Sequence, residues 1–328
     1  MKEINDRIVM NTPEDGMKTF DFGNRKVHFY VASNRKEKIN QVCDSLYPFG
    51  NYKIPYHYHD CGSVTYIILK GSFELILNGK RCVCEKGDII NVPAHCPYGI
   101  RIIDENTLIR EIYTDFDMLE TYTDSEQMKI SGRAYKAGQK YMKDFEEKHH
   151  WFELTEPAGT EVIEKNTLPQ ISTEEKAIYE YTGWNGIECR LKVGRWDLNR
   201  SKEIWEYRLL KNYQLQYFAP DKNERIYSVK SGKAMIEIND EILFANAGDI
   251  IHIPAYRAFS LTAVEDNTVL YDVNVSARLF RMLEMLELAQ RDEAENTKDE
   301  NWIKELLKLN DCGLTGFIKT DFIIEKGA

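Results

Sequence analysis

Short apolar runs alternate with polar and turn-forming residues along most of the chain. The apolar-rich run at residues 73–77 is followed by Asn78-Gly79, the strongest short-range hairpin signal, and then by a second short run. A Gly-Asp turn comes next, and the buried run after it ends at Pro-Ala, because proline cannot donate to a sheet ladder. Short strands separated by turns in this way predict an all-β sandwich or barrel.

This pattern occurs twice. Residues 71–98 align without a gap to residues 232–259 at a constant offset of 161, and eight of the 28 positions are identical. The identical pairs are Gly71/Gly232, Asn78/Asn239, Gly87/Gly248, Asp88/Asp249, Ile89/Ile250, Ile90/Ile251, Pro93/Pro254 and Ala94/Ala255. The chain therefore contains two copies of one unit.

Helical periodicity appears between and after the copies. Residues 116–148 are typical of a partly helical linker, and residues 302–309 form a short amphipathic piece. Between them, a longer helix is predicted to place one apolar face on the second copy, formed by Leu279, Met282, Leu283 and Leu286.

Length and charge exclude several classes of protein. The chain has 328 residues, and 43 basic against 53 acidic residues give a formal charge of −10, which disfavours nucleic acid and anionic lipid surfaces as partners. No apolar run approaches the roughly 18–20 residues needed to cross a bilayer, and the first residues lack the apolar segment of a signal peptide. Seven cysteines, an odd number, favour reduced thiols. We expect a cytoplasmic protein without membrane contact.

The repeated unit resembles the cupin superfamily, and the chain as a whole looks like a bicupin. Tyr56-His57-Tyr58-His59 matches the His-x-His of the first cupin motif, which in that family opens a metal site inside the barrel. The resemblance covers about residues 25–115 and 165–275. It implies two tandem cupin barrels (double-stranded β-helix, or jelly roll), with a helical linker and C-terminal helices.

The domains expected from this resemblance have the following bounds: an N-terminal barrel at 1–115, a linker at 116–150, a degenerate barrel at 151–275, and C-terminal helices with a tail at 276–328.

The sequence also departs from the cupin pattern. Val64 stands where the family has a glutamate ligand, and Tyr98 stands where it has a second-motif histidine. In the second copy the offset brings Phe218 and Pro220 opposite the two histidines, and neither side chain coordinates a cation. We therefore expect the second barrel to be metal-free, with a structural or dimer-forming role.

A metal site in the first barrel is predicted from strand alternation, which points His57 and His59 to the same face. A third donor is needed, and the candidates are His95, Tyr98, Cys61 and Cys96. Thiolate with imidazole favours Zn, whereas oxygen donors also allow Fe, Mn or Ni. The metal ligands that we predict are His57, His59 and His95.

Aromatic residues around this motif suit a small organic ligand. Tyr98 is the candidate catalytic residue, as a proton donor or base beside a metal, and its alternative role is an aromatic wall for the ligand. Tyr56, Tyr66 and His95 are the candidate substrate-binding residues, although His95 also suits a solvated loop. His149-His150 is interpreted as a solvated pair at the end of the linker.

Two functions remain open at this point. The first is a metal-dependent enzyme of isomerase, lyase or oxygenase type, which acts on a sugar-like, hydroxy-acid or phenolic small molecule. The second is a binding or sensing bicupin that holds a small ligand without metal or chemistry. A scaffold role is the weaker third, and a homodimer is the expected assembly.

Overall fold

The computed structural model describes most of the chain. The described residues are 8–10, 16–35, 38–115, 117–131, 139–184, 187–194, 202–217, 224–254, 257–274, 279–292, 299, 301–302, 305–306 and 315–316. They fall into two compact units. The first contains the described residues from 16 to 176, and the second contains those from 177 onward together with a short strand at residues 9–10.

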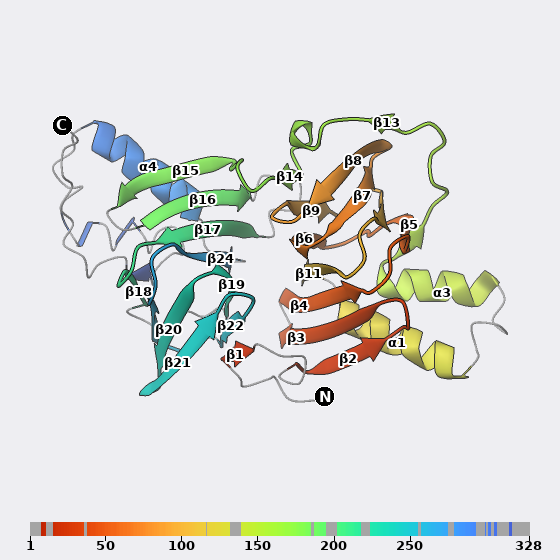
Figure 1. The fold of residues 1–328 in the computed structure, drawn as a ribbon, viewed down its shortest axis with the longest axis horizontal. Helices are drawn as coiled ribbons and strands as arrows, with labels where there is room; N and C mark the ends of the chain where they lie inside the picture. Colours follow the sequence, from red (N-terminus) through yellow and green to blue (C-terminus); the bar gives the residue numbers. More distant parts are fainter. Residues whose placement is uncertain are drawn as a thin grey trace. The chain divides into compact units, whose positions relative to one another are not determined.

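The first unit is a barrel of two sheets (Figure 1). Its sheets have the strand orders β14-β9-β6-β11-β4-β3-β2 and β12-β5-β10-β7-β8-β13. The strands are β2 (Lys18–Asp21), β3 (Lys26–Arg35), β4 (Lys38–Tyr47), β5 (Lys53–Tyr58), β6 (Ser63–Lys70), β7 (Ser72–Leu77), β8 (Lys80–Glu85), β9 (Ile89–Pro93), β10 (Tyr98–Ile102), β11 (Thr107–Thr114), β12 (Phe152–Glu153), β13 (Glu161–Val162) and β14 (Ile171–Ser172). Side chains from both sheets, such as Val64 and Leu75, form one buried core.

The second unit repeats this architecture. Its sheets have the orders β1-β22-β19-β24-β17-β16-β15 and β21-β20-β23-β18-β25. The strands are β1 (Val9–Met10), β15 (Tyr179–Trp184), β16 (Ile187–Val193), β17 (Glu203–Leu209), β18 (Gln214–Tyr217), β19 (Arg225–Ser231), β20 (Lys233–Ile238), β21 (Glu241–Asn246), β22 (Ile250–Ile253), β23 (Phe259–Ala263), β24 (Thr268–Asn274) and β25 (Thr315–Gly316). A second core, which includes Trp205 and Leu261, fills this barrel.

The repeated turn residues have the same role in both units. Asn78 and Gly79 take φ values of 49° and 76° between the paired strands β7 and β8, and Asn239 and Asp240 take 50° and 65° between β20 and β21. Two consecutive positive φ values define the tight hairpin turn that matches strand twist. The predicted hairpins are therefore confirmed.

The Gly-Asp pairs close a second kind of turn. The carboxylate of Asp88 accepts a hydrogen bond from the backbone N–H of Glu85 at 2.9 Å, and Asp249 accepts one from Asn246 at 2.7 Å. The preceding glycine has a φ of 92° in the first unit and 97° in the second, a conformation that side chains with a Cβ rarely adopt. This geometry explains why both residues recur in the repeat.

Helices accompany each unit. The linker forms α1 (Met118–Ser131) and α3 (Gln139–His149), and a short 3-10 turn, η2, spans Lys165–Thr167. In the second unit α4 (Leu279–Arg291) buries the four predicted residues, Leu279, Met282, Leu283 and Leu286. Leu306, in the second amphipathic piece, is also buried, while residues 303–304 and 307–309 of that piece lie outside the described part of the chain.

The predicted fold class is confirmed: the chain is mainly β, with two tandem barrels, a helical linker and a C-terminal helix. Among the residues that the structure describes, no helix is both long and apolar enough to span a membrane.

Candidate metal and ligand site in the first barrel

The His-x-His motif lies at the end of β5. His57 and His59 are both buried, with 0% and 4% of their surface exposed, and their ring centroids are 5.1 Å apart. Because alternate residues of a strand share a face, both imidazoles lie on the inner side, as the sequence predicts. Two histidines in this position can serve as the nucleus of a metal centre.

Backbone carbonyls fix the tautomer of both imidazoles. His57 Nδ1 lies 2.7 Å from the carbonyl oxygen of Pro55, and His59 Nδ1 lies 2.9 Å from that of His150. A carbonyl oxygen only accepts, so each Nδ1 carries the proton and each Nε2 keeps its lone pair. This is the arrangement that orients metal-ligating histidines in proteins.

The Nε2 atom of His57 is buried and has no hydrogen-bond partner among the described residues. A buried polar atom without a partner is costly, so it calls for a ligand, an ion or a water. Burial lowers the pKa of His57 to about 3, with a further lowering from His59. Burial also lowers the pKa of His59 to about 4. Both rings are therefore neutral near pH 7, the form that binds metal.

Tyr98 and Tyr66 extend this site into the barrel. The Tyr98 hydroxyl lies 3.4 Å from His59 Nε2 and 2.8 Å from the Tyr66 hydroxyl. Burial raises the pKa of both phenols above the usual value, so both remain protonated while no cation is near. The Val64 side chain, in the place of the family's glutamate, belongs to the same apolar core as the two tyrosines.

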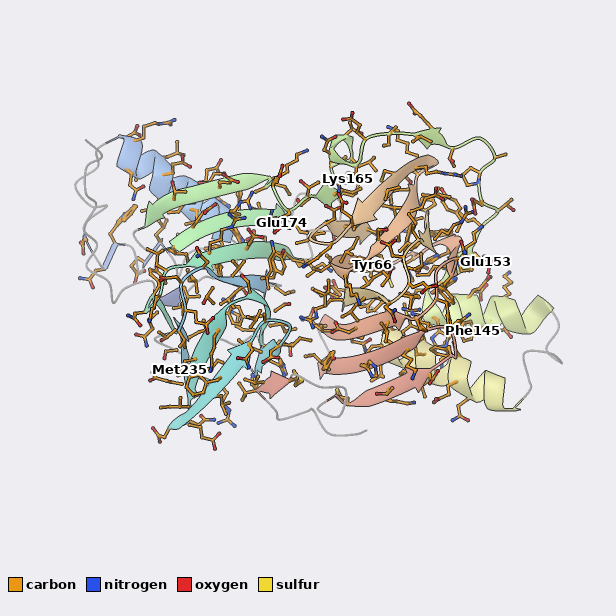
Figure 2. All side chains as sticks on the ribbon, in the orientation of Figure 1. Tyr66, Phe145, Glu153, Lys165, Glu174 and Met235 are labelled. Carbon is orange, nitrogen blue, oxygen red and sulfur yellow. The ribbon has the colours of Figure 1, made fainter. Side chains whose placement is uncertain are left out.

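Trp151 covers the histidines from the side of the linker. Its ring stacks on His57 with centroids 4.0 Å apart and 9° between the planes, and it meets His59 edge to face. The same indole lines a pocket of about 220 Å³ together with Arg25, Tyr52, Tyr122 and Phe145. Figure 2 labels two of the residues that line the pocket, Phe145 on α3 and Glu153 on β12. An aromatic pocket therefore lies next to the residue that covers the two imidazoles.

A buried ion pair contributes to the wall of this pocket. The Arg25 guanidinium donates to Glu111 Oε1 at 2.7 Å and to Ser45 at 2.9 Å, and the Tyr113 hydroxyl donates to the other oxygen of Glu111. Arg25 also lies over the ring of Tyr122 at 5.0 Å. The ion pair therefore fixes the Arg25 guanidinium beside an aromatic cavity.

The remaining predicted residues lie apart from the two imidazoles. Tyr56 precedes His57 on β5 and so lies on the opposite face of that strand. His95 is exposed in a turn with a φ of 59°, and its ring is 6.2 Å from that of Tyr58. Cys96 is buried and accepts a hydrogen bond from Asn78. The structure thus brings His57, His59, Tyr98 and Tyr66 together and leaves Tyr56, His95 and Cys96 outside that group.

His149 corrects the interpretation of His149-His150 as a solvated pair. His149 is 4% exposed, with Nδ1 3.2 Å from the hydroxyl of Thr121 and Nε2 3.0 Å from Asp124, because α3 turns this residue toward α1. His150 is half-exposed and contacts Asp60. The prediction of a solvated position was therefore wrong for His149.

The second barrel has different residues at the matching positions. Arg225 and Phe259, opposite Val64 and Tyr98, are both buried. Phe218 and Pro220, which stand opposite the two histidines, lie outside the described residues.

Sequence reasoning missed Arg25, Glu111 and Trp151. The repeat offset contained a signal for one of them, because Asp272 stands 161 positions after Glu111, and each is a buried acid near an arginine. The guanidinium of Arg225 lies 3.8 Å from Asp272. Extending the repeat to these strands would have identified the acidic position in both barrels.

Comparison with known proteins agrees with this fold. Residues 45–109 match the family described as Cupin domain. The oxalate decarboxylase of Bacillus subtilis, in a structure determined at pH 4.6, superposes with a TM-score of 0.50 at 11% identity, over 82% of this chain and 76% of that one. A Cupin 2 conserved barrel domain protein from Leptotrichia buccalis gives 0.50 at 12% identity, over 84% and 98%. No curated protein sequence matches the chain.

The match to the Cupin domain family lies within the first barrel, and the two solved structures share the fold of this chain across most of its length. At 11% and 12% identity these structures support the fold alone. The chemistry has to be argued from the residues of the site.

Proposed function

We propose that the first barrel is the active site of a metal-dependent enzyme that acts on a small organic molecule. His57 and His59 would hold a divalent ion through Nε2, and the Tyr98 oxygen would be the third donor. The observation that carries this proposal is the buried, unpartnered Nε2 of His57, next to an imidazole held in the same tautomer. A metal bound here would polarise an oxygen of the substrate as a Lewis acid.

The chain's own residues have separate roles in this proposal. The hydrogen bond between the hydroxyls of Tyr66 and Tyr98 would hold or pass a proton at the Tyr98 oxygen, because the His59 Nε2 atom that Tyr98 contacts in this structure would be taken by the ion. Trp151 and Tyr122 offer aromatic surface to the substrate, while Arg25, whose charge is paired with that of Glu111, supports the ring of Tyr122 in the pocket wall. Acid–base groups of this kind support isomerase or lyase chemistry over an oxygenase.

The donor set selects among the candidate ions. Two imidazoles and a phenol oxygen suit Zn, Fe, Mn or Ni. The thiols of Cys61 and Cys96 have contacts elsewhere and would not be donors to this ion. His95 would be an outer contact for a ligand rather than a metal donor, since its side chain is exposed near Tyr58. Tyr56 is buried on the other face of β5 and would not contact the ion.

A metal-free binding protein is the second candidate function. The observation in its favour is the flat stack of Trp151 on His57, which places an aromatic surface between the imidazole and the pocket of about 220 Å³. In this case a planar or sugar-like ligand would stack on Trp151 while the imidazoles stay without an ion.

Metal analysis separates the two functions. Protein purified without a histidine tag or added metal is compared with the His57→Ala/His59→Ala variant by elemental analysis. The enzyme proposal predicts a decrease of about one equivalent of a transition metal per chain in the variant. Equal metal content in both proteins, with retained ligand binding, would favour the binding protein.

We also propose a cytoplasmic homodimer that binds neither nucleic acid nor membranes. The acidic net charge of −10 supports the absence of a nucleic-acid partner, and two-fold dimers are the commonest assembly of soluble proteins. Sedimentation at several protein concentrations tests the dimer.

A further inference from the structure

The segment that follows α3 closes the first barrel with two adjacent residues, His150 and Trp151, which we call the strap. The carbonyl oxygen of His150 accepts the bond that orients His59, and the Trp151 ring lies on His57. His150 has a φ of 53°, and its side chain contacts the chain next to β5. The strap therefore has two contacts with the barrel interior and a third contact outside it.

The outside contact is a cluster of three metal-binding side chains. One ligand atom each from Asp60, Cys61 and His150 lies within 4.8 Å of the others. His150 Nδ1 is 2.7 Å from Asp60 Oδ1, and both side chains are partly open to solvent. In the described part of the chain, no other three histidine, cysteine or acidic side chains come as close together.

This position also explains where Cys61 lies. Alternation along β5 would place Cys61 beside His57 and His59, but the strand ends at Tyr58. The chain then turns, with Gly62 at a φ of 65°, so that Cys61 joins Asp60 rather than the inward-facing imidazoles.

We propose that Asp60, Cys61 and His150 form a second, surface metal site that binds Zn²⁺ and holds the strap in place. A carboxylate oxygen, a thiolate and an imidazole nitrogen are three donors that Zn²⁺ takes in tetrahedral sites, and water would occupy the fourth position. The ion takes the place of the Nδ1 proton of His150, which moves to Nε2 of the neutral imidazole, and it displaces the proton of the Cys61 thiol, so one proton is released to solvent.

The site links a surface ion to the barrel. His150 would be fixed on one side by the ion while its backbone orients His59, and Trp151 follows directly in the chain. The proposal does not depend on a metal at His57 and His59, because neither imidazole contributes a donor to the surface cluster.

Zn²⁺ titration in competition with a chromophoric chelator tests the site in the His57→Ala/His59→Ala variant, which removes the barrel imidazoles. About one equivalent of Zn²⁺ is expected to bind. Adding Cys61→Ser removes one of the three donors. We expect the affinity for Zn²⁺ to fall by at least about tenfold, since loss of a ligand's hydrogen-bond partner alone has an effect of that size. His28→Ala, a partly exposed histidine outside the cluster, is the matched control and leaves the affinity unchanged. Equal Zn²⁺ affinity with and without Cys61→Ser would overturn the proposal.

Co²⁺ provides a test that needs no change to the barrel. Wild-type protein loaded with Co²⁺ is expected to show a thiolate-to-metal charge-transfer band in the near ultraviolet, which Cys61→Ser abolishes and Cys96→Ser retains. A wild-type spectrum without this band, or a band that survives in Cys61→Ser, would overturn the proposal. Loss of the band only in Cys96→Ser would place the thiolate elsewhere and overturn it as well.

Discussion

The indole of Trp151 lies flat on the imidazole of His57, with ring centroids 4.0 Å apart and 9° between their planes. The stack joins the strap to the motif at the end of β5, and it places the imidazole behind an aromatic cover. Because Trp151 also lines the pocket, this residue forms the boundary between the pocket and the imidazole of His57.

Replacing Trp151 with alanine tests that boundary. The substitution exposes His57 to solvent and removes packing of a partly buried ring, so we expect a loss of about 1–3 kcal/mol in unfolding free energy. Bound metal should also leave faster when a chelator is added. Trp151→Phe keeps a ring on His57 and is the control. Equal chelation rates in wild type and Trp151→Ala would show that the indole does not cover the site.

The two tyrosines give a matched pair of substitutions. Tyr98→Phe removes the hydroxyl that lies near both His59 and Tyr66, whereas Tyr66→Phe leaves the contact between Tyr98 and His59 in place. Each change costs about 1 kcal/mol of stability for the lost hydrogen bond. If Tyr98 is the third donor, metal affinity falls by at least about tenfold in Tyr98→Phe and much less in Tyr66→Phe. The same loss in both variants would contradict that role.

The buried ion pair between Arg25 and Glu111 predicts a strong effect on folding. Arg25→Met leaves the carboxylate of Glu111 buried without its cation, and such a break costs about 3–5 kcal/mol. The double variant Arg25→Met/Glu111→Gln removes both charges and should recover part of that loss. Chemical denaturation measures both values. A double variant less stable than the sum of the single changes would contradict this account of the pair.

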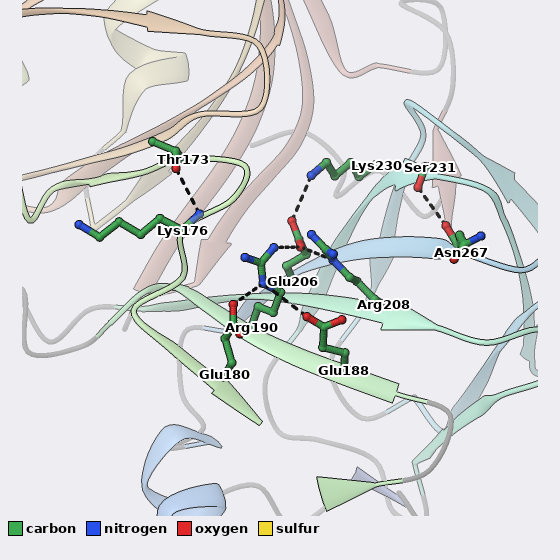
Figure 3. A network of polar contacts seen from close by, with 10 residues as sticks. All are labelled: Thr173, Lys176, Glu180, Glu188, Arg190, Glu206, Arg208, Lys230, Ser231 and Asn267. Atoms are coloured by element: carbon green, nitrogen blue, oxygen red, sulfur yellow. Dashed lines mark hydrogen bonds and ion pairs between the residues drawn. The ribbon is translucent and has the colours of Figure 1, made fainter. Parts of the chain in front are cut away.

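Glu206 is a buried carboxylate in a network of basic side chains of the second unit (Figure 3). Its pKa predicts how the stability of this unit changes at acidic pH. Burial alone would raise its pKa, but Lys192, Lys230 and Arg208 outweigh burial and lower the pKa to about 2. A lowered folded-state pKa stabilises the protein above the unfolded value near 4.5, and this contribution of about 3 kcal/mol is lost as pH falls from about 4.5 to about 2.

The check is unfolding free energy measured between pH 5 and pH 2. Glu206→Gln should flatten the decrease over this range, while Glu180→Gln, a half-exposed acid that contacts Arg190 in the same network, should leave the decrease in place. If the unfolding free energy of Glu206→Gln decreases with pH as in the wild type, Glu206 is not the source of that decrease.

The sequence predicted the features that depend on local chemistry. The turn at Asn78-Gly79, the Asp88 turn and the buried face of α4 follow from residue type and spacing, and the same rules place His57 and His59 on one face. These features need only neighbouring residues and the periods of strands and helices.

The features that the sequence did not predict join distant positions. The bond from His59 to His150 spans 91 positions, and the pair of Arg25 with Glu111 spans 86. The spacing of residues along one strand does not indicate which distant loop covers that strand. The position of Cys61 was missed for a different reason, because the strand ends at Tyr58 before the alternation reaches it.

The central claim is a metal ion between the Nε2 atoms of His57 and His59. The most direct measurement is X-ray diffraction from crystals of the metal-loaded protein at the absorption edge of the metal found by elemental analysis. The account predicts an anomalous peak within bonding distance of both Nε2 atoms, with the Tyr98 oxygen as a neighbour. A second peak at Asp60, Cys61 and His150 would belong to the surface site. Crystals of metal-loaded protein with no peak inside the first barrel would contradict the central claim.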